Sequence, residues 1–170
     1  MKRKIVLLTA AMTMGLALTA CGGSGDSEGG SGSGQESGGG YTFTSGSTVI
    51  EMNADASAVV EELGDADEYF ESESCAFEGL DKVYTYPGFT LNTYPVDDKD
   101  YVLSVVFRDD TVSTEEGISI GSTKDEVTEA YGEPASESAT ELVYEKGDSE
   151  MTIGLDGDSV STLEISAVTE

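Results

Sequence analysis

Residues 50–64 spell IEMNADASAVVEELG, and the same pattern recurs 68 positions later as ISIGSTKDEVTEAYG, residues 118–132. The apolar positions, one glutamate and the closing glycine coincide without a gap. Self-similarity at a fixed spacing is the sequence signature of a repeated structural unit. We therefore expect one unit to be present twice, in residues 41–117 and again in residues 118–170.

The first copy has the pattern of a short amphipathic helix. Its apolar residues recur at the i, i+3, i+4 and i+7 spacing that forms one stripe; they are Ala56, Val59, Val60 and Leu63. Asp55 or Asn53 is suited to cap the amino end, and Gly64 is suited to the positive-φ position at the carboxyl end. Because an isolated helix of about 10 residues is marginal in water, we expect it to dock on another element.

The second copy predicts a helix in the same place. Thr123 and Glu126 have the spacing of a capping box, and the apolar stripe consists of Val127, Ala130 and Tyr131. The helix should stop at Gly132-Glu133-Pro134, because proline cannot continue it.

Three strand-like segments follow each helix. The first set is expected over residues 82–86, 89–94 and 101–107, and the second over residues 141–144, 150–155 and 159–165, with turns rich in Asp, Gly and Pro between them. Residues 111–117 are expected to connect the copies. The predicted fold class is α+β, a tandem repeat of a helix followed by a three-stranded antiparallel meander. Each unit is small for an independent core, so the two should pack as one body; whether their sheets join stays open.

These residues resemble a known family. The run Gly121–Pro134, a capped helix ending in Gly-Glu-Pro before a meander, resembles the repeat unit of β-lactamase-inhibitor-like proteins and of SmpA/OmlA-type outer-membrane assembly lipoproteins. The run Ser74–Tyr86, followed by Thr93-Tyr94-Pro95, is similar to uncharacterised clostridial surface lipoproteins with the same duplicated layout. The resemblance covers most of residues 49–166 and implies the fold, not inhibitory activity. The inhibitor repeats hold disulfides that this sequence cannot form, and Asn53 stands where the second copy has Gly121.

The amino-terminal segment is typical of a secretory signal. Lys2-Arg3-Lys4 forms a basic region, and residues 5–18 are apolar but short for a membrane span. Leu18-Thr19-Ala20-Cys21 matches the lipobox of bacterial lipoproteins, which implies a signal peptide over residues 1–20 and lipidation of Cys21. Its acyl chains, palmitate for example, would hold the protein at the extracytoplasmic face of the cell membrane. The alternative is an ordinary secreted protein with a chance cysteine.

Residues 21–40 are nearly all Gly and Ser after the cysteine, which predicts a flexible tether and favours a Gram-positive surface lipoprotein. With Cys21 lipidated, Cys75 has no partner for a disulfide within the chain. A nucleophilic role would need activation that no His is present to provide. We therefore expect Cys75 to be a small buried core residue.

Charge and composition exclude several classes of function. The chain has 34 acidic and 8 basic residues, a net charge of −26, so a role in binding nucleic acid is excluded. The absence of His removes His-based catalytic triads and most zinc sites. The turns Asp97–Asp100 and Asp156–Asp158 are rich in the oxygen ligands that calcium binds. However, Val160 stands where an EF-hand needs a ligand, and Asp-Gly also suits a tight hairpin turn.

The first copy is dense in tyrosine and contains a candidate binding surface. Phe89, Leu91 and Thr93 alternate with Thr90, Asn92 and Tyr94, so one face of this strand should be core and the other open. The candidate binding residues are Tyr84, Tyr86, Thr90, Asn92 and Tyr94. The alternative is that the tyrosines pack the core with their hydroxyls at its edge.

The sequence therefore predicts a non-enzymatic, membrane-anchored lipoprotein that binds a protein or peptide through an open sheet face, with a partner that carries basic patches. No catalytic residue, metal ligand or cofactor is predicted. The alternative is a structural or assembly factor of the cell envelope without a dedicated ligand. An acidic hydrolase is the third hypothesis, although no spacing singles out a carboxylate pair.

Overall fold

The computed structural model describes residues 39–169, which fall within one compact unit spanning residues 35–170. The predicted signal peptide, the predicted lipidation site Cys21 and the tether up to residue 38 lie outside the described residues. The elements occur in the order β1 (Thr42–Ser45), β2 (Thr48–Glu51), α1 (Ala56–Leu63), β3 (Glu68–Glu73), β4 (Leu80–Tyr86), β5 (Phe89–Val96), β6 (Lys99–Phe107), α2 (Lys124–Tyr131), β7 (Ser136–Glu137), β8 (Glu141–Lys146), β9 (Ser149–Asp156) and β10 (Ser159–Ala167).

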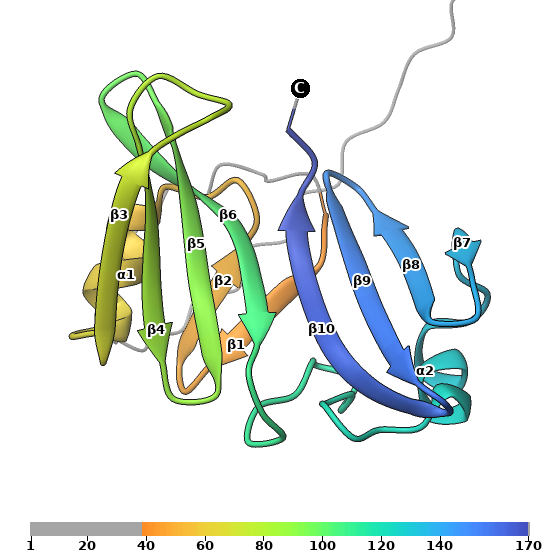
Figure 1. Ribbon diagram of the computed structural model, residues 1–170. Helices are drawn as coiled ribbons and strands as arrows, with labels where there is room; N and C mark the ends of the chain where they lie inside the picture. Colours follow the sequence, from red (N-terminus) through yellow and green to blue (C-terminus); the bar gives the residue numbers. More distant parts are fainter. Residues whose placement is uncertain (1–38, 170) are drawn as a thin grey trace, which may run out of the picture. The chain divides into compact units, whose positions relative to one another are not determined.

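The fold is α+β, dominated by one antiparallel sheet. Its eight strands lie in the order β3-β4-β5-β6-β10-β9-β8-β7, while β1 and β2 form a separate hairpin (Figure 1). The strands that follow α1 and those that follow α2 meet where β6 pairs with β10, with Val105 opposite Ile165. The question that the sequence left open is thereby answered: the two sets of strands belong to a single sheet.

Both helices begin as their sequences predict. Asp55 caps α1 by accepting a hydrogen bond from the amide of Ser57 at 3.1 Å. On α2, the amide of Glu126 donates to Thr123 Oγ1 at 3.2 Å, and the amide of Thr123 donates to Glu126 Oε2 at 2.7 Å. This reciprocal pair is the predicted capping box.

Both helices also end on a glycine with positive φ. Gly64 has φ 78° and donates its amide to the carbonyl of Val60, and Gly132 has φ 78° and donates to the carbonyl of Thr128. A Cβ atom is unfavourable at such φ values, which explains the choice of glycine at these positions.

The prediction counts three strands after each helix, whereas the structure has four. All six predicted strands are present, within β4, β5, β6, β8, β9 and β10. β3 and β7 are additional, and so is the β1–β2 hairpin. β3 escapes prediction because all six of its residues are exposed, so no buried face imposes an alternating pattern. β7 has only two residues, too few for any pattern.

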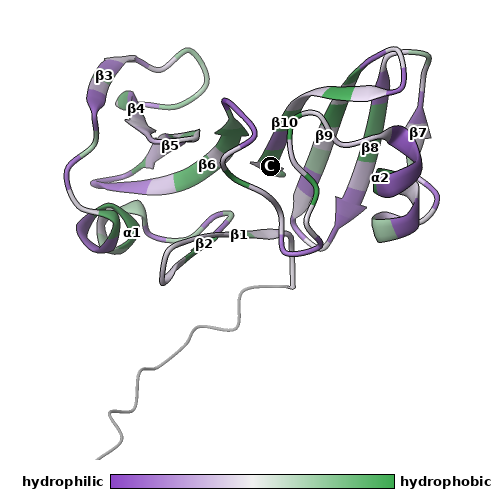
Figure 2. Cartoon of the chain, turned by 90° about the horizontal axis from the view of Figure 1, so that it is seen from below, coloured by the Kyte–Doolittle hydropathy of each residue, from purple (hydrophilic) through white to green (hydrophobic). Residues whose placement is uncertain are grey.

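The core lies against one face of the sheet. α1, α2 and the β1–β2 hairpin lie behind the sheet in Figure 1, and the view from below in Figure 2 places α1 and the hairpin on one side of β4–β6. The ring of Phe43 in β1 packs 4.9 Å from that of Phe89 and 5.1 Å from that of Phe107. The hairpin therefore closes the core over β5 and β6. Burial of each such side chain stabilises the fold by about 1.5–3 kcal/mol.

Candidate functional site

The other side of the sheet forms a continuous surface, which we call the open face. Directly paired residues share a face, so the strand registers define two rows of side chains across it. The first row is Glu68, Thr85, Thr90, Val106, Glu164, Thr152, Val143 and Ser136, and the second is Phe70, Val83, Asn92, Ser104, Ser166, Glu150 and Glu145. The first row crosses all eight strands. No helix or strand of the described residues covers this face in Figure 1.

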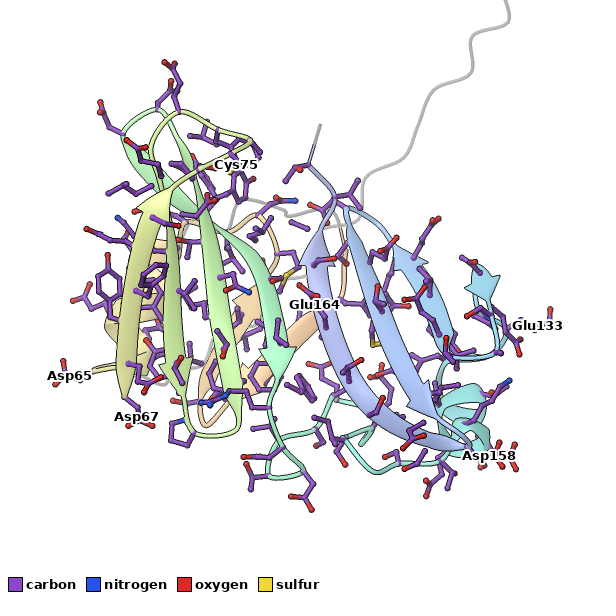
Figure 3. The ribbon with its side chains drawn as sticks, viewed as in Figure 1. Asp65, Asp67, Cys75, Glu133, Asp158 and Glu164 are labelled. Atoms are coloured by element: carbon purple, nitrogen blue, oxygen red, sulfur yellow. The ribbon has the colours of Figure 1, made fainter. Side chains whose placement is uncertain are left out.

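The open face is uneven in charge. Over β4, β5 and β6 its side chains are valine, threonine, asparagine and serine, and Asn92 Nδ2 donates to Ser104 Oγ at 2.9 Å. Over β10, β9 and β8 it carries the carboxylates Glu164, Glu150 and Glu145, and Glu164 lies near the middle of the sheet (Figure 3). The face therefore has a neutral half over β4–β6 and an acidic half over β10–β8, and Glu68 adds one carboxylate at the β3 edge.

The lysines of the strands are engaged in contacts within the unit. Lys82 Nζ lies 2.6 Å from Asp100 Oδ2, and Lys99 Nζ lies 2.8 Å from Asp55 Oδ2. Lys146 Nζ lies over the ring of Tyr41, 5.3 Å from its centroid. None of these three contacts involves Glu164, Glu150 or Glu145, so these lysines do not neutralise the carboxylates of the open face.

The predicted alternation along β5 is confirmed from Phe89 to Thr93. Phe89, Leu91 and Thr93 are buried, and Thr90 and Asn92 are half-buried on the open face. Tyr94 departs from the pattern because its ring is covered: it packs 4.9 Å from the ring of Phe77 in the β3–β4 loop.

The five candidate binding residues do not share one surface. Tyr84 pairs with Leu91 and Tyr86 with Phe89, so both tyrosines belong to the core-facing side of the sheet. Tyr86 is 4% exposed, its ring stacks on Phe89 at 5.2 Å, and burial raises the pKa of its hydroxyl. Thr90 and Asn92 both lie on the open face, in neighbouring rows on β5. Tyr86 therefore fits the alternative interpretation, in which a tyrosine ring packs in the core and its hydroxyl lies at the edge of the core.

Phe70 and Val83 are open-face residues that the sequence did not single out. Phe70 is 63% exposed, and a hollow of about 530 Å³ is lined by Glu68, Tyr69, Phe70, Val83 and Thr85. The only signal for Phe70 was an aromatic pair in an otherwise acidic stretch. Recognising it required knowing that β3 exists.

A chain of polar contacts joins the two halves of the sheet at one end. Tyr94 Oη donates to Asn53 Oδ1 at 2.8 Å, and Asn53 Nδ2 donates to Asp148 Oδ2 at 3.3 Å. Asn53 has φ 62°, a conformation that asparagine tolerates better than most residues. These contacts stabilise the arrangement of β5 against the β8–β9 turn.

Cys75 is exposed, so the prediction that it is a buried core residue is wrong. The hydroxyl of Ser74 accepts hydrogen bonds from the amides of Ala76 and Phe77, which tightens the loop around these residues. Phe77 supplies the packing contact with Tyr94, and Cys75 lies in the loop above the strands (Figure 3).

The carboxyls with displaced pKa values are shifted downward. Hydrogen bonds from Lys99 and Ser57 lower the pKa of Asp55 to about 2, and hydrogen bonds from Thr111 and Thr123 lower the pKa of Asp109 and Glu126 respectively. A general acid needs the opposite shift. Within residues 39–169, no group of three or more Cys, Asp or Glu side chains is arranged to hold a metal ion.

Comparison with known proteins found no relative of this chain. No protein-family model matches the chain, and no curated protein or solved structure matches it. Across the described part of the chain, neither helix has the length and apolar character needed to cross a membrane.

Proposed function

We propose that this chain is a non-enzymatic, lipid-anchored extracytoplasmic protein that binds a protein or peptide partner through the open face. The observation that carries the proposal is the continuous row of side chains across eight strands, with the helices and the hairpin on the other side. An antiparallel sheet commonly leaves one face solvated, but this face also offers valine side chains and the ring of Phe70 for contact.

The charge distribution indicates what kind of partner would fit. The neutral half of the open face, around Val83, Asn92 and Val106, suits apolar and hydrogen-bonding contacts. The acidic half, around Glu150 and Glu164, suits lysine and arginine. Complementary charge steers association and makes it sensitive to salt. The fitting partner therefore has an apolar patch next to a basic one.

The membrane anchor is proposed from the lipobox at Leu18–Cys21 behind a basic and apolar segment. With Cys21 lipidated, the Gly/Ser segment up to residue 40 would hold the sheet away from the membrane surface. That spacing would leave both halves of the open face accessible to a partner outside the cell.

We also propose that the unit arose as a tandem repeat of a helix with a strand meander. Two sets of contacts support this origin. Tyr86 Oη donates to the carbonyl of Gly64 at 3.3 Å, and Tyr144 Oη donates to that of Gly132, also at 3.3 Å. Both glycines directly follow their helices.

The second set lies where the chain enters each helix. Asn53 donates its amide to the carbonyl of Val102, and Gly121 donates to that of Val160. Both Asn53 and Gly121 have positive φ, 62° and 93°. Asn53 thus keeps the backbone conformation that glycine provides 68 positions later.

The proposal is tested by affinity capture from the envelope and secreted fractions of the source organism. The bait is the chain from residue 21 onward with Cys21→Ser. It is used in two forms: without further change, called wild type below, and with Thr90→Lys, which places a cation in the neutral half of the open face. Ala58→Lys, on the exposed side of α1, is the matched control. A partner captured by wild type and by Ala58→Lys but lost with Thr90→Lys supports the open face.

Capture that Thr90→Lys leaves unchanged would exclude the open face as the contact surface. No captured partner at low or high salt would favour the alternative, a structural factor of the envelope. A second comparison tests the acidic half, with the double variant Glu150→Gln/Glu164→Gln and, as its control, Glu61→Gln/Glu62→Gln. Only the first double variant should reduce the salt dependence of capture.

A further inference from the structure

The two edges of the sheet differ in a way that bears on how a partner binds. At one edge, β7 has two residues. At the other, β3 has six residues, all of them exposed, and pairs with β4 without a register shift. Alternate residues of an edge strand direct their backbone N–H and C=O groups away from the sheet. Among the described residues, β4 is the only strand that pairs with β3.

Edge strands in soluble proteins are usually protected by shortness, proline, lysine or a bulge. β7 is protected by its length, whereas β3 has the sequence EYFESE with no proline and no lysine. Its only charges are carboxylates, which protect it against an acidic strand but attract a basic one. Phe70 and Tyr69 remain 63% and 51% exposed at this edge. β3 is therefore a regular, accessible template for one more strand.

The side chains of β3 select what can pair with it. Phe70 and Glu68 lie on the open face, whereas Tyr69 and Glu71 belong to the row that faces the core side. The ring of Tyr69 packs 5.0 Å from that of Tyr84, and its hydroxyl donates to Glu71. An added strand would thus meet carboxylates on both faces, with an aromatic residue between them.

A second copy of this chain is a poor occupant. Antiparallel self-pairing opposes residues of the same face, so it places Glu71 opposite its own copy in one register and Glu73 opposite Asp67 in the next. Like charges directly opposite each other destabilise a strand pair, and the net charge of −26 adds repulsion between whole chains. A strand with lysine or arginine at these positions would instead be attracted.

We propose that β3 binds an extended segment of the partner by strand addition, and that this segment carries basic residues around a central apolar one. The inference rests on the proposed function and names the partner's chemistry. The central apolar residue would lie beside Phe70, over the hollow lined by Val83 and Thr85. Basic residues would lie beside Glu68, Glu71 and Glu73. Main-chain hydrogen bonds supply affinity in this mode, and side chains supply specificity.

The test uses a blocked hexapeptide, Lys-Thr-Lys-Val-Thr-Lys, titrated into the chain from residue 21 onward with Cys21→Ser, and followed by NMR of the backbone amides. The proposal expects the largest shifts in the amides of residues 68–73. Two further peptides are N-methylated at alternate residues, one on the odd positions and one on the even. Only one of the two sets faces β3, so one peptide should lose affinity by at least about tenfold and the other should not.

The protein side has a matched pair of variants. Glu68→Gln/Glu71→Gln/Glu73→Gln removes the carboxylates of β3, and Glu62→Gln/Glu129→Gln/Glu133→Gln removes the same charge from exposed positions away from β3 and the open face. The first variant should weaken binding severalfold more than the second. Circular dichroism verifies that both remain folded.

Equal binding of the two N-methylated peptides would overturn strand addition, because it would show attraction by charge alone. Equal weakening by the two triple variants would overturn the assignment to β3. Dimerisation of the wild-type chain through β3, detected by sedimentation, would also overturn it. If the peptides do not bind at β3 but capture of the partner remains sensitive to Thr90→Lys, strand addition is wrong while the proposed function stands.

Discussion

The hydroxyl of Tyr86 donates a hydrogen bond to the carbonyl oxygen of Gly64, across 3.3 Å, and so ties β4 to the end of α1. Tyr144 makes the same contact with Gly132 at the end of α2. Each tyrosine is nearly buried, at 4% and 3% exposure, and only its hydroxyl reaches the helix end. These two contacts join helix to sheet in both halves of the unit.

Tyr86→Phe and Tyr144→Phe should each lower the free energy of unfolding by about 0.5–1.5 kcal/mol, because each removes one hydrogen bond and leaves the ring in place. Urea unfolding followed by circular dichroism measures both. If the contacts are equivalent, the two losses should be similar; a loss confined to one variant would contradict that equivalence.

The joined sheet should unfold as one cooperative body. Leu91→Ala in β5 and Ile153→Ala in β9 each remove a fully buried side chain and should cost about 2–5 kcal/mol. Both should shift the same transition, detected by circular dichroism and by tyrosine fluorescence, since the chain has no Trp. Val49→Ala, at a position 51% exposed, is the control with little effect. Two separate transitions in either core variant would show that the β6–β10 junction does not couple the halves.

Asn53 combines a positive φ with two side-chain hydrogen bonds. Asn53→Gly loses the bonds but keeps the conformation, whereas Asn53→Ala also places a Cβ atom at positive φ. We expect the alanine variant to be less stable than the glycine variant by about 1–2 kcal/mol. Gly121→Ala should show a comparable loss because φ is 93° there and no side-chain bond is involved. Equal stability of Asn53→Ala and Asn53→Gly would remove the conformational argument.

Asp55 should give the unfolding free energy a specific dependence on acid pH. Its pKa is lowered from 3.8 to about 2 in the folded chain, chiefly by the hydrogen bond from Lys99 and then by those from Ser57. A lowered folded-state pKa stabilises the protein above the unfolded value, and this contribution is lost as pH falls from about 4 to 2. Asp55→Ala should cost about 1 kcal/mol at pH 7 through loss of the cap.

The difference between wild type and Asp55→Ala isolates this group from the many other carboxyls, which titrate in the same range. That difference should shrink between pH 4 and pH 2 in thermal unfolding. Asp55→Asn keeps a capping oxygen and loses the charge, so it should retain part of the stability at pH 7. A difference that stays constant with pH would contradict the role of the carboxylate.

Cys21→Ala tests the lipid anchor in cells. Because the proposed acyl chains have no other attachment site in the lipobox, the variant should move from the membrane fraction to the soluble or secreted fraction. Immunoblots of fractionated cells measure this, with Cys75→Ala as the matched control that should stay with the membrane. Membrane retention of Cys21→Ala would contradict the anchor.

Much of the local structure was predictable because it depends on neighbours in the chain. The caps at Asp55 and Thr123 and the glycines that end both helices depend on contacts within a few residues. The six predicted strands, with the buried positions of β5, were visible for another reason: one side of each strand packs on the core, and the alternation of residue types records which side.

The candidate site was harder to predict because exposure depends on distant contacts. Tyr84 and Tyr86 lie on the core-facing side because of how β4 pairs with β5, and Tyr94 is covered by Phe77 from another loop. Cys75 is exposed because the hydrogen bonds of Ser74 and the packing of Phe77 shape that loop. None of these contacts can be inferred from the type of the residue concerned or from its neighbours in the sequence.

By itself, the sequence determined the two helices, their caps, six of the strands and the acidic character of the chain. Only the tertiary structure decided that Val105 and Ile165 lie side by side, that the strands form one sheet, and that β3 is its exposed edge. The physical reason is the range of the interactions. Helix capping and alternation act over a few residues, whereas the joining of the two sets of strands depends on the β6–β10 pairing, between residues about 60 positions apart.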